Sequence, residues 1–239
     1  MSARITLRYE VLPAEAESWV LPEDTMPESA PHDRVVELIR NQLQHHVART
    51  GRAALVGRNL AIRWVKERWR IGVDPDVCLV EPPPPEGDEV ESVCTWMPGH
   101  HAPALAVEVV SGSNAYKDYA SAPERYAACG TRELWVFDPK LAGPRARGPF
   151  RLQQWLRDED DGFRRVYAGD GPFFSPTVSA WVFAVSEGRQ LRLADDRDGT
   201  SWWTTGEEAE RAAKEAERAA KEAALARIAE LEAQLGRKS

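Results

Sequence analysis

Residues 105–111 read LAVEVVS, and this stretch decides how the chain folds and what it can do. Both sets of alternating positions carry apolar side chains, which is typical of a β-strand covered on both faces of its sheet. Glu108 lies in the middle of this strand. A buried carboxylate without a partner is costly or takes up a proton. Glu108 is therefore either a hydrated or salt-bridged residue near a strand end, or a residue that holds a cation.

The segments that flank this strand predict an α/β domain. VVELIRNQLQHHVA has apolar residues at helical spacing and predicts a helix over 33–49. A second helix is predicted over 115–129, with Pro123 offsetting its first turns and Gly130 ending it. ELWVF, residues 133–137, predicts the next strand. The order strand, helix, strand predicts that LAVEVVS and ELWVF are neighbours in a mixed sheet.

Asp76 supplies a second carboxylate, at the start of the predicted strand DPDVCLV. Strand alternation puts Asp76 and Cys78 on one face, and likewise Ala106 and Glu108. If the two strands are neighbours and these faces coincide, both carboxylates reach one hard cation. Mg²⁺ or Mn²⁺ takes oxygen ligands, so two carboxylates and a backbone carbonyl, that of Val109, are enough to hold it. Such a site needs no histidine.

Lys117 is the third candidate member of this site. It follows Glu108 by nine residues and falls in the first turn of the predicted second helix. From there its ammonium can reach back over the carboxylates, orient a water molecule or stabilise charge on a phosphate oxygen. The alternative is a solvent-exposed helix lysine.

PDVCLV, LAVEVVSGSN, KDY and YAACGTRELWVFDP occur in an order and spacing that resemble the Uma-type family of putative restriction endonucleases, a branch of the PD-(D/E)XK nucleases. The resemblance covers residues 31–203. It implies a restriction-endonuclease-like α/β core, a mixed β-sheet flanked by helices, and divalent-metal hydrolysis of DNA phosphodiesters. It places Asp76 and Glu108 at the family's two acidic positions. It also implies that an acid near the first helix can join the site, here Glu28 or Glu37.

One position departs from the family pattern. Many members carry a lysine four residues after the aspartate that corresponds to Asp118, and this chain has Ala122 there. Lys117 or Arg125 is left to replace that lysine. An arginine stabilises phosphate charge but does not give up a proton, so the departure bears directly on catalytic competence.

The C-terminal residues 206–239 differ in composition from the domain predicted over 1–205. AERAAKE occurs twice in succession, and one helix is predicted over 206–236. Two interpretations are open: a solvated helix with internal Glu/Lys pairs, or a coiled coil that forms a homodimer or binds another protein. The coiled-coil interpretation depends on an apolar seam at its end: Ile228, Leu231 and Leu235.

Composition narrows the possible partners and surroundings. The net charge of −7 gives no broad attraction to nucleic acid, so DNA must be contacted through a local basic strip or a bound metal. The three cysteines form no CxxC pair, which favours a reducing compartment. No apolar run suits a membrane span or a signal peptide, and a cytoplasmic location without a membrane partner is expected.

Two functions follow from these features. The first is a magnesium-dependent endodeoxyribonuclease that uses Asp76, Glu108 and Lys117. The second is a nuclease-like fold with impaired catalysis that acts as an interaction module through its C-terminal helix.

Overall fold

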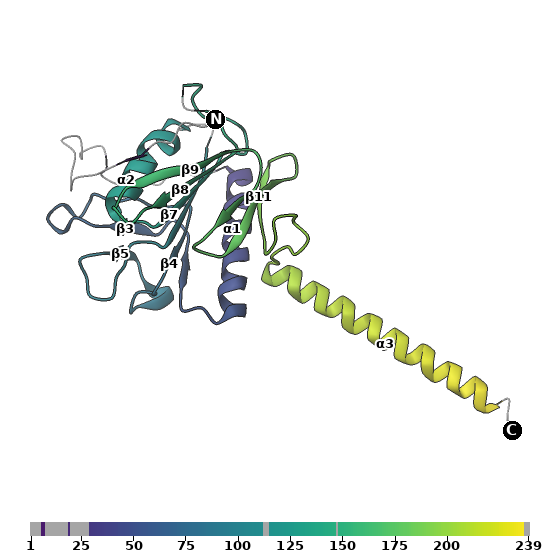
Figure 1. Cartoon of the computed structure of the whole chain (residues 1–239). Helices are drawn as coiled ribbons and strands as arrows, with labels where there is room; N and C mark the ends of the chain where they lie inside the picture. The colour runs from purple at the N-terminus through teal and green to yellow at the C-terminus, as the bar shows by residue number, and fades with distance from the viewer. Residues whose placement is uncertain (1–5, 8–18, 20–28, 112–114, 147, 237–239) are drawn as a thin grey trace. The chain divides into compact units, whose positions relative to one another are not determined.

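In the computed structural model, the described residues are 6–7, 19, 29–111, 115–146 and 148–236 (Figure 1). They belong to two compact units, Met1–Trp203 and Thr204–Ser239. Within the described ranges, no helix combines the length and the apolar character that a membrane crossing requires.

A mixed seven-stranded sheet forms the centre of the first unit. Its strands are β1 (Thr6–Leu7), β2 (Leu55–Gly57), β4 (Val77–Val80), β6 (Leu105–Val109), β7 (Glu133–Phe137), β8 (Leu152–Arg157) and β9 (Phe163–Gly169). They lie in the order β1-β9-β8-β7-β6-β4-β2. The pair β6 and β7 is parallel, as expected for a strand–helix–strand unit, whereas β4 and β6 are antiparallel. The predicted pairing of LAVEVVS with ELWVF is therefore confirmed.

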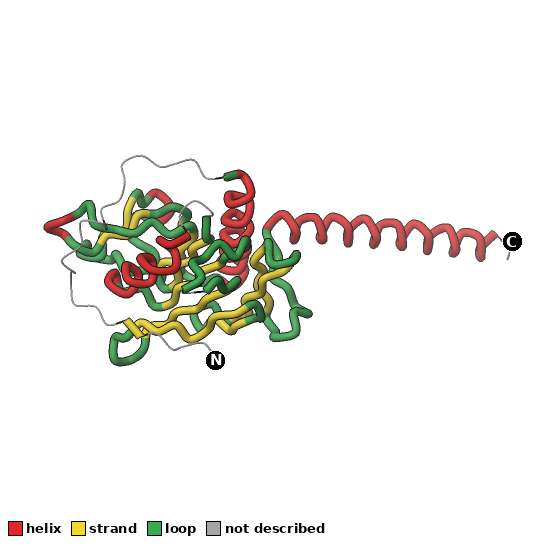
Figure 2. The backbone as a smooth tube through the Cα atoms, turned by 90° about the horizontal axis from the view of Figure 1, so that it is seen from above, coloured by secondary structure: helices red, strands yellow, loops and turns green. Residues whose placement is uncertain are grey.

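The helix α1 (Ala30–Thr50) covers one face of this sheet (Figures 1 and 2). It begins three residues before the predicted start, because Pro31 is well tolerated in a first helical turn, where its missing N–H has no partner to lose. Its apolar stripe, which includes Val36, Ile39 and Leu43, is fully buried. Covered on the other side as well, the strand β6 is buried along its whole length, as its continuous apolar pattern predicts.

A small antiparallel sheet packs in the same apolar cluster as α1. Its strands lie in the order β10 (Phe173–Ser175), β11 (Ala180–Val185) and β12 (Gln190–Ala194). The buried Gln42 of α1 donates to the carbonyl of Leu191 at 3.2 Å and accepts from the N–H of Leu193 at 3.1 Å. The N–H of Trp203 donates to the carbonyl of Leu193 at 2.8 Å. These three hydrogen bonds occupy backbone groups along the outer side of β12.

The opposite face of the main sheet carries a π-helical turn, η4 (Lys117–Ser121), that continues into α2 (Ala122–Cys129). The N–H of Ala122 donates to the carbonyl of Lys117, five residues back. Pro123 follows at once and has no N–H to give, so the regular helical ladder is interrupted where the wide turn ends. The offset predicted at Pro123 is confirmed, and the helix ends at Gly130, whose φ of 90° is left-handed.

The remaining elements of the first unit are short. A parallel pair, β3 (Ala61–Arg63) and β5 (Ser92–Cys94), lies beside the main sheet, and η2 (Lys66–Arg68) and η3 (Gly87–Glu89) are single helical turns. The predicted fold class, an α/β core with a mixed sheet flanked by helices and a long C-terminal helix, is confirmed.

The second unit is the helix α3 (Gly206–Gly236), over the residues predicted. A capping box starts it: the N–H of Thr205 donates to Glu208 at 2.8 Å, and the Glu208 N–H donates to the Thr205 hydroxyl at 3.1 Å. Arg218 and Glu222 form an ion pair one turn apart, at 2.9 Å. Leu225 and Ile228 are more than half exposed along this helix. The structure of the single chain is thus compatible with both interpretations of the tail.

Candidate functional site

The register of β4 against β6 brings Asp76 and Glu108 together. Val77 pairs with Val107 and Cys78 with Ala106, so the register continued by one step sets Asp76 opposite Glu108. Both side chains then point to the face that carries Cys78, Ala106 and α2. The pairing that the alternation required is the one that the strands adopt.

Asp76 is fixed at the end of β6 by a backbone hydrogen bond. Its carboxylate Oδ2 accepts from the N–H of Val109 at 2.6 Å, and the residue is buried. The carbonyl of the same Val109 lies 2.9 Å from Nε2 of His32, which is itself 3.5 Å from Asp76 Oδ2. Three polar atoms from α1, β6 and the start of β4 therefore meet at one point.

Glu108 is held from the opposite direction, by α2. The residue is only 2% exposed, and its Oε1 accepts a hydrogen bond from the Tyr126 hydroxyl at 2.6 Å. Burial raises the pKa of Glu108 well above its usual value, the Lys117 charge opposes this rise, and the Asp76 charge adds to it. A nearby positive charge stabilises the ionised form of such a buried carboxylate and lowers its pKa.

Lys117 provides one such charge. Attraction by Glu108 is the largest cause of the raised pKa of Lys117, and Asp118, Asp74 and Asp76 contribute to it as well. Its Nζ lies 4.0 Å from Asp118 Oδ1, and its side chain is 38% exposed. The charge of Lys117 is therefore attracted by the neighbouring acids, while part of its side chain still reaches solvent.

Arg125, the other candidate cation, follows on α2. Burial lowers the pKa of its guanidinium, while the charges of Asp74 and Glu108 raise it. Arg125 thus shares the electrostatic surroundings of the same acids. Ala122 is buried in the apolar cluster that includes Tyr119 and Tyr126, so the position four residues after Asp118 supplies no charge.

The acids proposed to join from the first helix do not do so in the described residues. Glu37 forms ion pairs with Arg40 at 3.5 Å and Arg58 at 3.6 Å. Arg58 also pairs with Asp33, so Glu37 belongs to a surface network of its own. Glu28 lies outside the described residues.

Three members of the site were missed by the sequence reasoning: Asp74, Asp118 and His32. Asp118 is buried, and burial raises its pKa to about 7. Burial likewise raises the pKa of Asp74. The sequence does indicate the two aspartates. In DPD, Asp74 lies two residues before Asp76, and in KDY, Asp118 follows Lys117 directly. His32 has only its place in the first turn of α1 as a signal.

Two other polar residues that could be taken for site residues serve the local structure. His100 accepts from the N–H of Cys94 at 3.0 Å and contacts Glu86 at 3.1 Å through its other ring nitrogen. Asp138 accepts from three backbone N–H groups of the turn that follows it, and from Tyr119. Neither belongs to the acid cluster of the candidate site, which consists of Asp74, Asp76, Glu108 and Asp118.

The donors at this site suit a hard divalent cation. Two carboxylates and the Val109 carbonyl offer oxygen donors, and Mg²⁺ needs no more from a protein because it keeps several waters. The raised pKa values of Asp74, Glu108 and Asp118 mark a surplus of buried acid that such a charge would relieve. Among the described residues, no three acidic, histidine or cysteine side chains are arranged as a ready metal cage.

The geometry defines a class of site: a buried acid pair with a lysine on a mixed sheet. A family profile described as "Uma2: Putative restriction endonuclease" matches residues 20–143, and the chain belongs to this family. Among solved structures, it is similar to a putative nuclease belonging to DUF820 from Anabaena variabilis ATCC 29413, at 14% identity and a TM-score of 0.43 over 64% of this chain and 76% of that chain. No curated protein matches. Membership of the family supports a nuclease function in general terms.

From the raised pKa of Asp118 we predict how the stability of the metal-free protein depends on pH. Its folded value of about 7 lies above the ordinary 3.8, so between these pH values the folded chain binds the extra proton. Stability contributed by this group is therefore lost as pH rises from about 4 through 7. We expect Asp118→Asn to stabilise the metal-free protein at pH 8 by on the order of 1–3 kcal/mol, and by much less at pH 4. Thermal melts in chelator at both pH values measure this, and an equal effect at the two would contradict it.

Proposed function

We propose that this chain is a metal-dependent endonuclease that hydrolyses DNA phosphodiester bonds. The observation that supports the proposal is the β4–β6 register, which sets Asp76 opposite Glu108. These acids attract the charge of Lys117. A buried acid pair whose charges attract one half-exposed lysine is costly as mere architecture. It is useful where a cation and a phosphate must be held side by side.

Asp76, Glu108 and the carbonyl of Val109 would hold the ion, Mg²⁺ or Mn²⁺. When bound, such an ion polarises a phosphoryl oxygen and lowers the pKa of a bound water. The protein's own task is to keep the ligands in place. The Val109 N–H orients Asp76, and the Tyr126 hydroxyl orients Glu108.

Lys117 is assigned to the reacting phosphate. Its ammonium stabilises negative charge that develops on a phosphate oxygen, or orients the attacking water. Because neighbouring acids raise the pKa of Lys117, it stays protonated at neutral pH and acts as a fixed positive charge. Arg125 would serve as a second, non-titrating charge on the same side.

The alternative is a nuclease fold with impaired catalysis that recruits a partner through α3. The buried Ala122 at the usual lysine position favours it, as do the exposed Leu225 and Ile228 of the tail. The two functions differ in whether DNA is cut.

Cleavage of supercoiled plasmid tests the proposal. We expect nicked and linear products with Mg²⁺ or Mn²⁺ and none in chelator. Structured RNA of similar length, in the same buffer, tests the choice of DNA as substrate. Intact plasmid across a range of metals and protein concentrations would favour the interaction module.

From the exposed apolar residues of α3 we predict that two copies of the chain associate. Leu225 and Ile228 are exposed in the single helix, and burying such a side chain contributes about 1.5–3 kcal/mol. We expect the full chain to form a dimer that weakens on dilution, and a chain ending at Thr205 to fold normally but remain more monomeric. Light scattering over a concentration series measures this. The same oligomeric state for both chains would assign the tail to another protein partner.

A further inference from the structure

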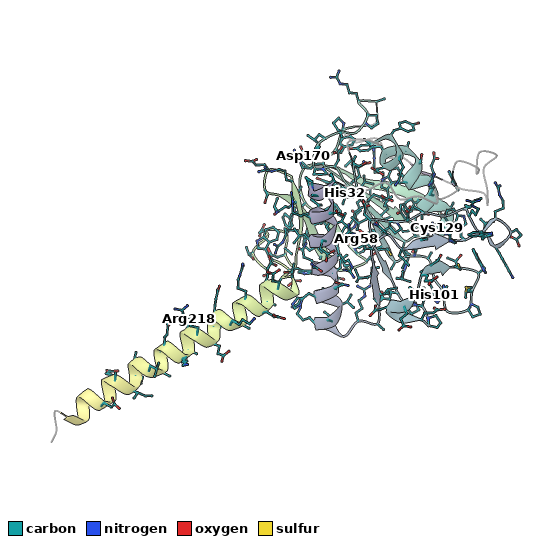
Figure 3. All side chains as sticks on the ribbon, turned by 180° about the vertical axis from the view of Figure 1, so that it is seen from behind. His32, Arg58, His101, Cys129, Asp170 and Arg218 are labelled. Atoms are coloured by element: carbon teal, nitrogen blue, oxygen red, sulfur yellow. The ribbon has the colours of Figure 1, made fainter. Side chains whose placement is uncertain are left out.

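His32 reaches the candidate metal site from the opposite face of the sheet. It lies in the first turn of α1, where Figure 3 labels it, whereas Glu108 contacts Tyr126 of α2 and Lys117 belongs to the adjoining η4. The residue is partly buried, and 9% of its side chain is exposed. Its Nε2 is directed to the end of β6, between the Val109 carbonyl and Asp76.

We propose that His32 is a nitrogen ligand of the divalent ion, beside Asp76 and the Val109 carbonyl, and that it biases the site toward Mn²⁺ over Mg²⁺. The inference rests on the proposed function, because it names one more ligand of the same ion. It adds a donor of a different chemical class to a set otherwise made of oxygen.

The interatomic distances carry the proposal. Neighbouring ligands of an octahedral ion with bonds of ~2.0–2.1 Å lie about 3 Å apart. His32 Nε2 is 2.9 Å from the Val109 carbonyl oxygen and 3.5 Å from Asp76 Oδ2. These spacings are close to those of adjacent corners of one coordination sphere. Binding would need no movement of the sheet, only a neutral ring with the Nε2 lone pair directed at the ion.

The chemistry of the ring predicts the metal preference. Imidazole suits first-row transition ions, whereas Mg²⁺ prefers oxygen and gives up water reluctantly. A nitrogen next to two hard oxygen donors therefore favours Mn²⁺ more than Mg²⁺. The competing interpretation is that His32 only donates a hydrogen bond to Val109 and balances the charge of Asp76. The two interpretations differ in whether the nitrogen touches the ion.

Pulsed electron paramagnetic resonance on the Mn²⁺-loaded full chain separates them. We expect nitrogen modulation from a directly bound imidazole, and its change to the ¹⁵N pattern when the protein is made with ¹⁵N-labelled histidine. His32→Gln should remove the signal and weaken Mn²⁺ binding about 10–100-fold by calorimetry, with a smaller loss for Mg²⁺. Thermal melts check that this variant is folded.

His101→Gln is the matched control, because His101 is an exposed loop histidine, also labelled in Figure 3. It should leave both the signal and the affinity unchanged. Mn²⁺ bound without nitrogen modulation would overturn the role of His32 and leave the proposed function standing. Failure of the wild-type chain to bind Mn²⁺ or Mg²⁺ at all would overturn both. A signal that persists in folded His32→Gln would also contradict the assignment.

Discussion

Glu108→Gln is expected to abolish metal-dependent cleavage of plasmid DNA and at the same time to raise the thermal stability of the metal-free protein. The amide keeps the shape and still accepts the Tyr126 hydrogen bond, but it is a far weaker cation ligand. Loss of several kcal/mol of transition-state stabilisation lowers the rate by at least about 10³-fold. Burial raises the pKa of Glu108, so removing its charge favours folding. A gain of about 1 kcal/mol corresponds to roughly 2–4 °C.

Opposite changes in activity and stability distinguish a site residue from a structural one. Melts in chelator at pH 8 and plasmid nicking with Mg²⁺ give the two readings. Glu37→Gln is the matched control, since its carboxylate pairs with Arg40 and Arg58, outside the acid cluster. It should leave cleavage unchanged. Cleavage by Glu108→Gln at the wild-type rate would exclude Glu108 as a ligand.

Lys117→Ala is expected to lower the turnover of DNA cleavage by about 10²-fold, while metal affinity changes little. The ammonium is not a ligand, but its charge lies among the acids and faces solvent. The measurement is single-turnover cleavage of a labelled duplex, together with calorimetric binding of Mn²⁺ to the same variant.

Arg125→Ala provides the comparison for Lys117. If Lys117 replaces the missing lysine, its loss lowers the rate far more than the loss of Arg125 does. The reverse order would give that role to the guanidinium. Equal wild-type rates for both variants would show that the site works without a cationic side chain.

The sequence predicted what depends on local pattern. Alternation within a strand fixes which residues share a face, so the common face of Asp76 and Glu108 could be stated before their strands were paired. The apolar runs of β6 and β7 and the helix predicted between them indicated their parallel pairing. The tail helix followed from its repeated composition.

What depends on distant contacts could not be predicted. His32 and Val109 are separated by 77 positions, and their contact requires α1 to cross the sheet at one particular angle. Asp118 is buried because the π-helical turn directs it inward, and helix periodicity assumes an ordinary turn. Asp118 was missed for this reason.

The hydrogen bonds of Gln42 to β12 have a consequence for solubility. An uncovered strand edge is a template on which other chains add strands, and it is a common origin of aggregation and domain swapping. The side-chain amide of Gln42 donates to the Leu191 carbonyl and accepts from the Leu193 N–H, and the Trp203 N–H donates to the Leu193 carbonyl. One side chain of α1 therefore shares the place of a next strand with Trp202 and Trp203, which bridge β12 at Ala194 and Leu193, and this part of the edge offers fewer free backbone groups to another molecule.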